Sequence, residues 1–187
     1  MAVKALIKRA IMLTLAMGTL TECSQPSRCK VGHADEDTTM KSSVTWLHLL
    51  RHTPFFTSLN TEQLRWVINH SCEWEARKGT FIAGAESGKP VSDDIWVLLD
   101  GGWQVEASGK VFPAGHADPG KWYSATDAAF PGRLVTTGKS YVMRISRSDM
   151  QEMLSMGFAF NNHMESGKQY YKVLSGQLSR SNHLTPN

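Results

Sequence analysis

The sequence contains little that identifies a chemistry. Only three cysteines occur in the 187 residues, too few for a disulfide scaffold. Twenty lysines and arginines stand against 17 acidic residues, and the resulting net charge of +3 is too small to indicate a nucleic-acid-binding surface. No apolar run approaches the roughly 20 residues that span a bilayer. The GxSxG, GxGxxG and CxxC motifs are absent, so no enzyme class is indicated.

The first 45 residues contain no aromatic residue. The seven phenylalanines, six tryptophans and four tyrosines all lie between Trp46 and Tyr171. Because large aromatic side chains dominate protein cores, the packed domain is predicted to begin near Trp46. The 41% apolar content of the chain is sufficient to build such a core.

The N-terminus has the pattern of a secretory signal. Lys4, Lys8 and Arg9 precede a mostly apolar stretch at 10–20, which is about half the length of a membrane span. Residues 20–23, LTEC, resemble the lipobox of bacterial lipoproteins, in which Cys23 would be lipidated, although Glu22 stands where that motif has a small residue. We therefore expect a periplasmic, membrane-anchored or secreted protein, with membrane contact only if Cys23 is lipidated. Translation from Met40 would instead give a cytoplasmic domain.

Four segments are predicted along the chain. Residues 1–22 form the targeting segment, 23–45 a flexible linker rich in Ser, Thr and acidic residues, 46–175 the folded domain, and 176–187 a disordered tail. If Cys23 carries lipid, Cys29 and Cys72 are free to pair in an oxidising compartment; the alternative is three unpaired thiols.

The folded segment changes its pattern twice. Two short helical stretches come first, and in the second Leu64, Val67 and Ile68 give one apolar face after a capping residue at Asn60 or Thr61. Residues 71–145 then form short apolar or alternating runs separated by glycine and proline. Helical patterns return at 146–155 and 158–178.

The turn signals between the runs predict antiparallel hairpins, and Asp100-Gly101-Gly102 is the strongest of them. The predicted fold class is mainly β: a small jelly-roll-like β-barrel with two N-terminal and two C-terminal helices.

This order of elements resembles the cyclic-nucleotide-binding-domain family, whose fold is a double-stranded β-helix. The likeness covers roughly residues 46–175 and is also local. The fragments that carry it are PFFTSLNTEQL at 54–64, KGTFIAGA at 78–85, IWVLLDGGWQV at 95–105 and ISRSDM at 145–150. They are similar to the family's entry helix, first hairpin, central strand with its return strand, and exit helix.

The resemblance also implies a phosphate-binding cassette at 119–133, PGKWYSATDAAFPGR. In the family, helix-start amides and an arginine hold the cyclic phosphate, and a glutamate binds the ribose. This stretch contains no glutamate, and Arg133 is displaced toward the next strand. The ligand-binding candidates that the resemblance gives are Gly120, Lys121, Trp122, Tyr123, Ser124 and Arg133.

Other chemistries find less support. Gly84 to Lys89 has three residues between its glycines where a P-loop has four, and Pro90 replaces the Ser or Thr that binds magnesium. A cupin-type metal site needs clustered histidines, whereas His48 and His52 form the only helically spaced pair. His70 and Cys72 are two residues apart and would share one face of a strand, which suggests a nucleophile pair only if a third orienting group exists.

The sequence thus favours a non-enzymatic binding or regulatory module without a cofactor, which no longer binds cyclic nucleotide. It is expected to act through a partner protein on the C-terminal helix at 158–175 and not through nucleic acid, since no helix-turn-helix follows the barrel. One alternative is a genuine sensor of cAMP or cGMP, and the other is a small barrel enzyme of cupin type.

Overall fold

The computed structural model describes residues 40–43, 45–85 and 91–182, and of residues 42, 181 and 182 only the backbone. The predicted targeting segment at 1–22, the lipidation candidate Cys23 and most of the P-loop-like stretch lie outside the described residues. Export and lipidation therefore stay predictions.

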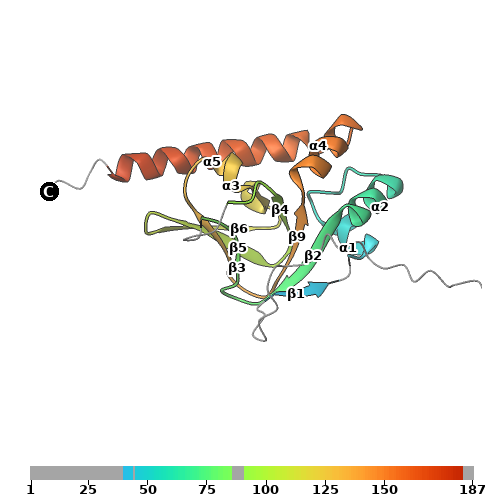
Figure 1. Cartoon of the computed structure of the whole chain (residues 1–187), viewed down its shortest axis with the longest axis horizontal. Helices are drawn as coiled ribbons and strands as arrows, with labels where there is room; N and C mark the ends of the chain where they lie inside the picture. Colours follow the sequence, from blue (N-terminus) through green and yellow to red (C-terminus); the bar gives the residue numbers. More distant parts are fainter. Residues whose placement is uncertain (1–39, 44, 86–90, 183–187) are drawn as a thin grey trace, which may run out of the picture.

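The described strands form two antiparallel sheets (Figure 1). The five-stranded sheet has the order β1 (Met40–Ser43), β2 (Ser71–Ala76), β9 (Ser140–Ile145), β4 (Ile95–Asp100) and β7 (Trp122–Tyr123). The four-stranded sheet has the order β3 (Phe81–Gly84), β8 (Arg133–Thr136), β5 (Gly102–Ala107) and β6 (Lys110–Gly115). The jelly-roll-like architecture is confirmed, but these strands form two facing sheets and no closed barrel.

Two predicted hairpins are instead corners between the sheets. Asp100-Gly101-Gly102 joins β4 to β5, and Lys78-Gly79 lies between β2 and β3; in each case the two strands belong to different sheets. Gly101 has φ +87°, and a Cβ there would lie 2.6 Å from the Lys139 carbonyl oxygen, so the corner requires glycine. A two-residue hairpin does occur at Ser108-Gly109 between β5 and β6, where both residues have positive φ.

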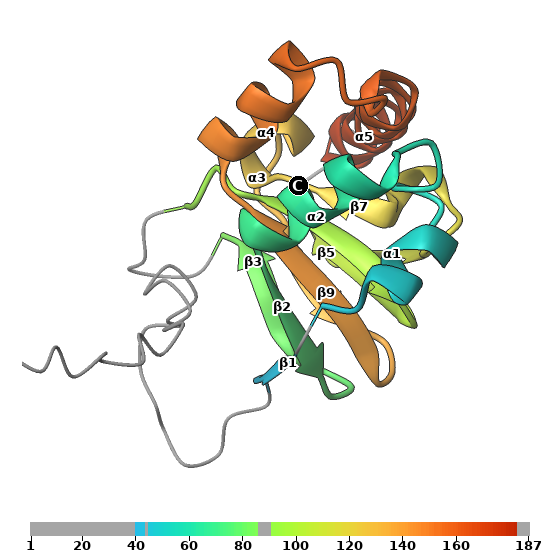
Figure 2. The same ribbon diagram turned by 90° about the vertical axis from the view of Figure 1, so that its right-hand side faces the viewer.

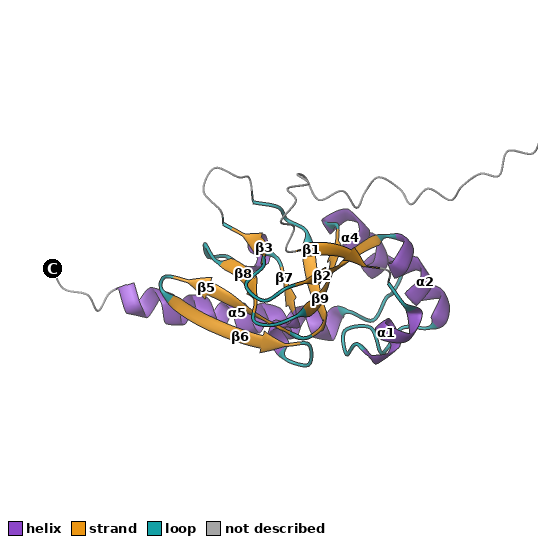
Figure 3. Cartoon of the chain, turned by 90° about the horizontal axis from the view of Figure 1, so that it is seen from below, coloured by secondary structure: helices purple, strands orange, loops and turns teal. Residues whose placement is uncertain are grey.

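The helices follow the prediction of two before and two after the strands. They are α1 (Leu47–His52), α2 (Thr61–Asn69), α4 (Arg147–Ser155) and α5 (Asn161–Asn182), with a 3-10 turn η2 (Pro119–Lys121) and the one-turn α3 (Ala125–Ala128) between strands. Asn60 begins α2 with a capping box in which its side chain accepts from the Gln63 N–H. Figure 3 shows α1, α2 and α4 gathered at one end of the strands, while α5 runs along them. Figure 2 views the molecule from that end, so α5 is seen end-on.

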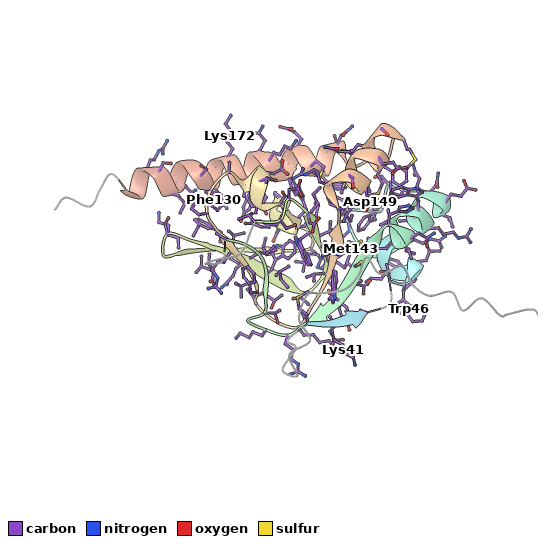
Figure 4. All side chains as sticks on the ribbon, in the orientation of Figure 1. Lys41, Trp46, Phe130, Met143, Asp149 and Lys172 are labelled. Atoms are coloured by element: carbon purple, nitrogen blue, oxygen red, sulfur yellow. The ribbon has the colours of Figure 1, made fainter. Side chains whose placement is uncertain are left out.

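Two apolar cores result from this arrangement. The first lies between the outer face of the five-stranded sheet and the helices, and Met143 on β9 is one of its buried members (Figure 4). The second fills the space between the sheets and contains Trp74, Trp96, Trp103 and Tyr123. Strand β4 contributes to both cores, which explains its continuous apolar run IWVLL.

Two predicted boundaries are wrong. The linker was predicted to extend to residue 45, but β1 lies inside it and pairs with β2. The tail was predicted to begin at 176, but α5 continues to Asn182 because Leu174 and Leu178, one helical turn apart, are both buried. Strand β1 was missed because a strand of four residues is too short for its alternating pattern to be recognised in the sequence.

Candidate functional site

The cassette segment, residues 119–133, is the candidate site, and most of its predicted binding residues are buried. Gly120, Lys121, Trp122, Tyr123 and Ser124 all have buried side chains or backbone, whereas Arg133 is exposed. Pro119 begins η2 with the φ that a helix start needs, and α3 ends at Ala129 with φ +57°. Whether these residues bind a ligand stays a prediction.

Helix α5 covers the cassette segment at Trp122. The Trp122 indole N–H donates to the His163 carbonyl at 2.9 Å, and the Tyr171 hydroxyl donates to the Trp122 carbonyl at 2.6 Å. A Cβ at Gly167 would lie 2.1 Å from Trp122 Nε1, so the helix approaches this closely only because residue 167 is glycine. The predicted aromatic contact residue therefore serves to dock α5.

Tyr123 points into the core between the sheets. Its hydroxyl donates to the Gly132 carbonyl at 3.4 Å, and its ring meets Tyr171 edge-on at a centroid distance of 5.8 Å. Burial raises the pKa of Tyr123 to about 12, so the phenol stays protonated. The second predicted aromatic contact is a core residue.

Arg147, which the sequence reasoning did not single out, contacts α3 and the residue before it. Its Nη2 lies 2.7 Å from Ser124 Oγ, 2.9 Å from Thr126 Oγ1 and 2.6 Å from Asp127 Oδ2. The Arg147 and Asp127 side chains are only 25% and 20% exposed, so this ion pair is shielded from solvent. The guanidinium thus occupies the oxygen acceptors of the segment and ties α3 to α4. No motif spacing would have found this contact, because the two residues are 20 positions apart.

Arg133 does not join the other predicted residues. It projects from β8 to the outside of its sheet, where Nη1 lies 3.6 Å from Glu106 Oε2 and the guanidinium carbon lies 5.5 Å from the Phe81 ring centroid. This side chain borders a surface groove of about 480 Å³ that Lys110 and Val111 also line. The pairing with Glu106 follows from the register of β5 with β8.

Lys121 is 7% exposed, and burial lowers its pKa while the nearby Asp118 carboxylate opposes the shift. His163 on α5 also has a lowered pKa, chiefly from burial and in smaller part from Lys121. The charge of Lys121 is thus held under α5 and not presented to solvent as a phosphate site would require.

The other catalytic and metal-binding sites considered from the sequence are not formed by the described residues. Cys72 is disulfide-bonded, and its predicted partner Cys29 lies outside the described residues. The pairing of Cys72 with His70 on one strand, which the sequence made less favoured than a buried structural thiol, does not form. His70 is the C-cap of α2, and its ring stacks on Trp66 at a centroid distance of 3.5 Å. Among the described residues, no three or more His, Cys, Asp or Glu side chains are grouped to hold a metal ion. None of the helices described is both long and apolar enough to cross a membrane.

Comparisons with known proteins give the fold. No family model matches the chain, and no curated protein matches it. Among solved structures, cAMP-bound PfPKA-R has a TM-score of 0.55 at 14% identity over 72% of this chain. The PKAR CBD2 domain bound to Sp-2Cl-cAMPS has a TM-score of 0.52 at 13% identity, over 76% of this chain and 92% of its own length. A CooA mutant from Carboxydothermus hydrogenoformans has a TM-score of 0.53 at 13% identity, over 73% and 90%.

The chain therefore has the cyclic-nucleotide-binding-domain-like fold that its sequence resembles. It spans 46% of the PfPKA-R chain it matches. By their names, two of these similar structures contain cAMP or an analogue of it.

Proposed function

We propose that this chain is a non-enzymatic binding and regulatory module that uses the cyclic-nucleotide-binding-domain-like fold without binding a cyclic nucleotide. One observation carries the proposal: in the segment where a phosphate would bind, the Asp127 carboxylate pairs with Arg147, whose guanidinium also donates to Ser124 and Thr126. A cyclic phosphate needs hydrogen-bond donors, so it would have to draw this guanidinium out of a shielded ion pair and would face the negative charge of Asp127. The absence of a glutamate from 119–133 supports the same reading.

The docking of α5 adds a second obstacle. Trp122 and Tyr123, the aromatic residues of the segment in which the resembled family binds its ligand, are fully buried under α5 and between the sheets. A ligand could reach them only after α5, which contacts Trp122 through Gly167 and Tyr171, moves away.

Calorimetry tests the proposal directly. Titration of cAMP and of cGMP into the chain is expected to give no saturable heat at ligand concentrations up to the millimolar range, because the Arg147 guanidinium is already paired with Asp127 and that carboxylate repels an anion. Saturable binding of either nucleotide would overturn the proposal and favour the sensor alternative. In that case Arg133→Ala decides the site: binding that survives the substitution removes Arg133 from the phosphate role.

The partner surface that we propose on the C-terminal helix is limited to its outward face. Met164, Tyr171, Leu174 and Leu178 are buried against the domain, whereas Lys172 projects away from the strands (Figure 4) and Val173 is 58% exposed. This face is polar, so the expected contact is a reversible one between polar surfaces.

Amine-reactive cross-linking in a native extract tests this surface. Cross-links to one recurring protein are expected through Lys168 and Lys172, which are both exposed on α5. Lys110, exposed at the β5–β6 hairpin, serves as the control. Cross-links to that protein through Lys110 but not through α5 would contradict the proposed surface.

We also propose that the protein is exported, as the basic start and the short apolar stretch of residues 1–20 indicate.

A further inference from the structure

Glu73 on β2 has a buried carboxyl group whose hydrogen-bonding capacity is only partly used. The residue is 4% exposed, and its Oε2 atom is buried with no hydrogen-bond partner among the described residues. Buried acids are seldom left in this state, because the ionised form loses the hydration it has in water. Neither the fold nor the proposed function requires an acid at this position.

The surroundings of Glu73 are strand β1 and an apolar neighbour. The register places Ser43 of β1 opposite Glu73 on one side and Met143 of β9 on the other. The hydroxyls of Ser43 and Thr45 hydrogen-bond to the carboxyl group. Ser43 is the last residue of β1 and Thr45 lies between β1 and α1, so the attachment of β1 and the state of Glu73 are linked.

Burial raises the pKa of Glu73 above 4.5, and the hydroxyls of Thr45 and Ser43 oppose the shift with smaller effects. No charged group among the described residues contributes to this balance. Lys41 on β1 and Lys139 beside β9 act on Glu75 instead. Helices α1 and α2, which cover this face of the sheet, carry the following titratable groups, none of which contributes: His48, Arg51, His52, Glu62, Arg65 and His70.

We propose that Glu73 is a proton-binding site that controls the attachment of β1, which is held firmly when Glu73 is protonated and loosens as the pH rises. Among the described strands, β1 is an edge strand of four residues, and its one partner is β2. Its detachment is therefore the least costly way to bring water to Oε2.

The direction of the pH effect follows from linkage. A group whose folded pKa is raised stabilises the folded state fully below its unfolded value and loses that contribution as the pH rises through its folded value. For Glu73 this contribution to stability begins to fall near pH 4.5. It is fully lost once the pH exceeds the pKa of Glu73 in the folded protein. The contact between β1 and β2 is thus expected to weaken with rising pH across that window.

Nuclear magnetic resonance on the whole chain tests the proposal. The Glu73 carboxyl carbon is expected to titrate above pH 4.5, and hydrogen-exchange protection of the β1 amides, corrected for the intrinsic rate, is expected to fall over the same range. Glu73→Gln should abolish this dependence. Glu75→Gln, on the same strand, is the matched control. It removes the attraction of Glu75 to Lys41 on β1 and so lowers β1 protection at every pH above 4.5, but it should keep the wild-type pH dependence, because the pKa of Glu75 lies below 4.5.

A second variant keeps the test decisive if Glu73→Gln does not fold. Thr45→Val removes one hydroxyl that lowers the pKa of Glu73, so the carboxyl is expected to titrate at a still higher pH in that variant. A Glu73 titration at or below pH 4.5, or β1 protection with the same pH dependence in wild type and Glu73→Gln, would overturn the proposal.

Discussion

Replacing Gly167 with alanine is expected to destabilise the protein by about 3 kcal/mol. The added Cβ would lie 2.1 Å from Nε1 and 2.5 Å from Cε2 of Trp122. That ring cannot move aside easily, because it is fully buried and donates to the His163 carbonyl. Helix α5 would have to lift from the cassette segment, which outweighs the gain of roughly 1 kcal/mol in helix propensity. Urea unfolding followed by tryptophan fluorescence measures the loss.

Gly176→Ala is the matched control for this prediction. Gly176 lies in the same helix, and a Cβ there would meet nothing within 4 Å. The same substitution is therefore expected to stabilise the protein by up to about 1 kcal/mol through helix propensity. If both variants became more stable, the close packing of α5 on Trp122 would be refuted.

Trp103→Ala is expected to cost about 3–5 kcal/mol, the range for removal of a buried large aromatic side chain. Trp103 is 1% exposed in the core between the sheets, and its indole N–H donates to the Gly120 carbonyl at 2.8 Å. The substitution leaves a cavity between the sheets and an unpaired carbonyl in the cassette segment. Thermal unfolding monitored by circular dichroism measures this effect as a lower Tm.

Trp46→Ala provides the comparison for the same chemical change at the surface. Trp46 is 68% exposed at the start of α1 and makes no side-chain capping bond. Its removal is expected to change the free energy of unfolding by no more than about 0.5 kcal/mol. Equal losses for the two tryptophan variants would contradict the assignment of Trp103 to the core.

The elements that the sequence predicted best are those whose apolar pattern is long or has a clear period. The face of α2 was predicted from Leu64 and Val67, and both are buried. The run IWVLL at 95–99 was identified as a strand, and its burial on both faces accounts for its lack of alternation. Strand β1 and the end of α5 beyond Leu178 escaped prediction. Strand β1 depends on pairing with β2, which is distant in the sequence, and the residues after Leu178 carry no apolar pattern.

The candidate site, too, could be predicted from the sequence only in part. The positions of Trp122 and Ser124 in the segment between strands were predictable, but the directions of their side chains were not. A side chain at a given position becomes a ligand contact or a core residue according to what packs against it. Here α5 packs against Trp122 and Arg147 reaches Ser124, and both come from later parts of the chain.

The sequence by itself determined the order of the helices and of the strands from β2 on, and the positions where turns interrupt them, because these depend on local periodicity and turn residues. The cyclic-nucleotide-binding-domain-like fold was expected from the resemblance of the ordered fragments to that family. The tertiary structure alone decided which strands pair across the glycine turns and where Arg133 points. It also decided that Arg147 occupies the cassette segment, and that Glu73 is buried beside β1. These outcomes depend on contacts between residues far apart in the chain, whose energies no local pattern encodes.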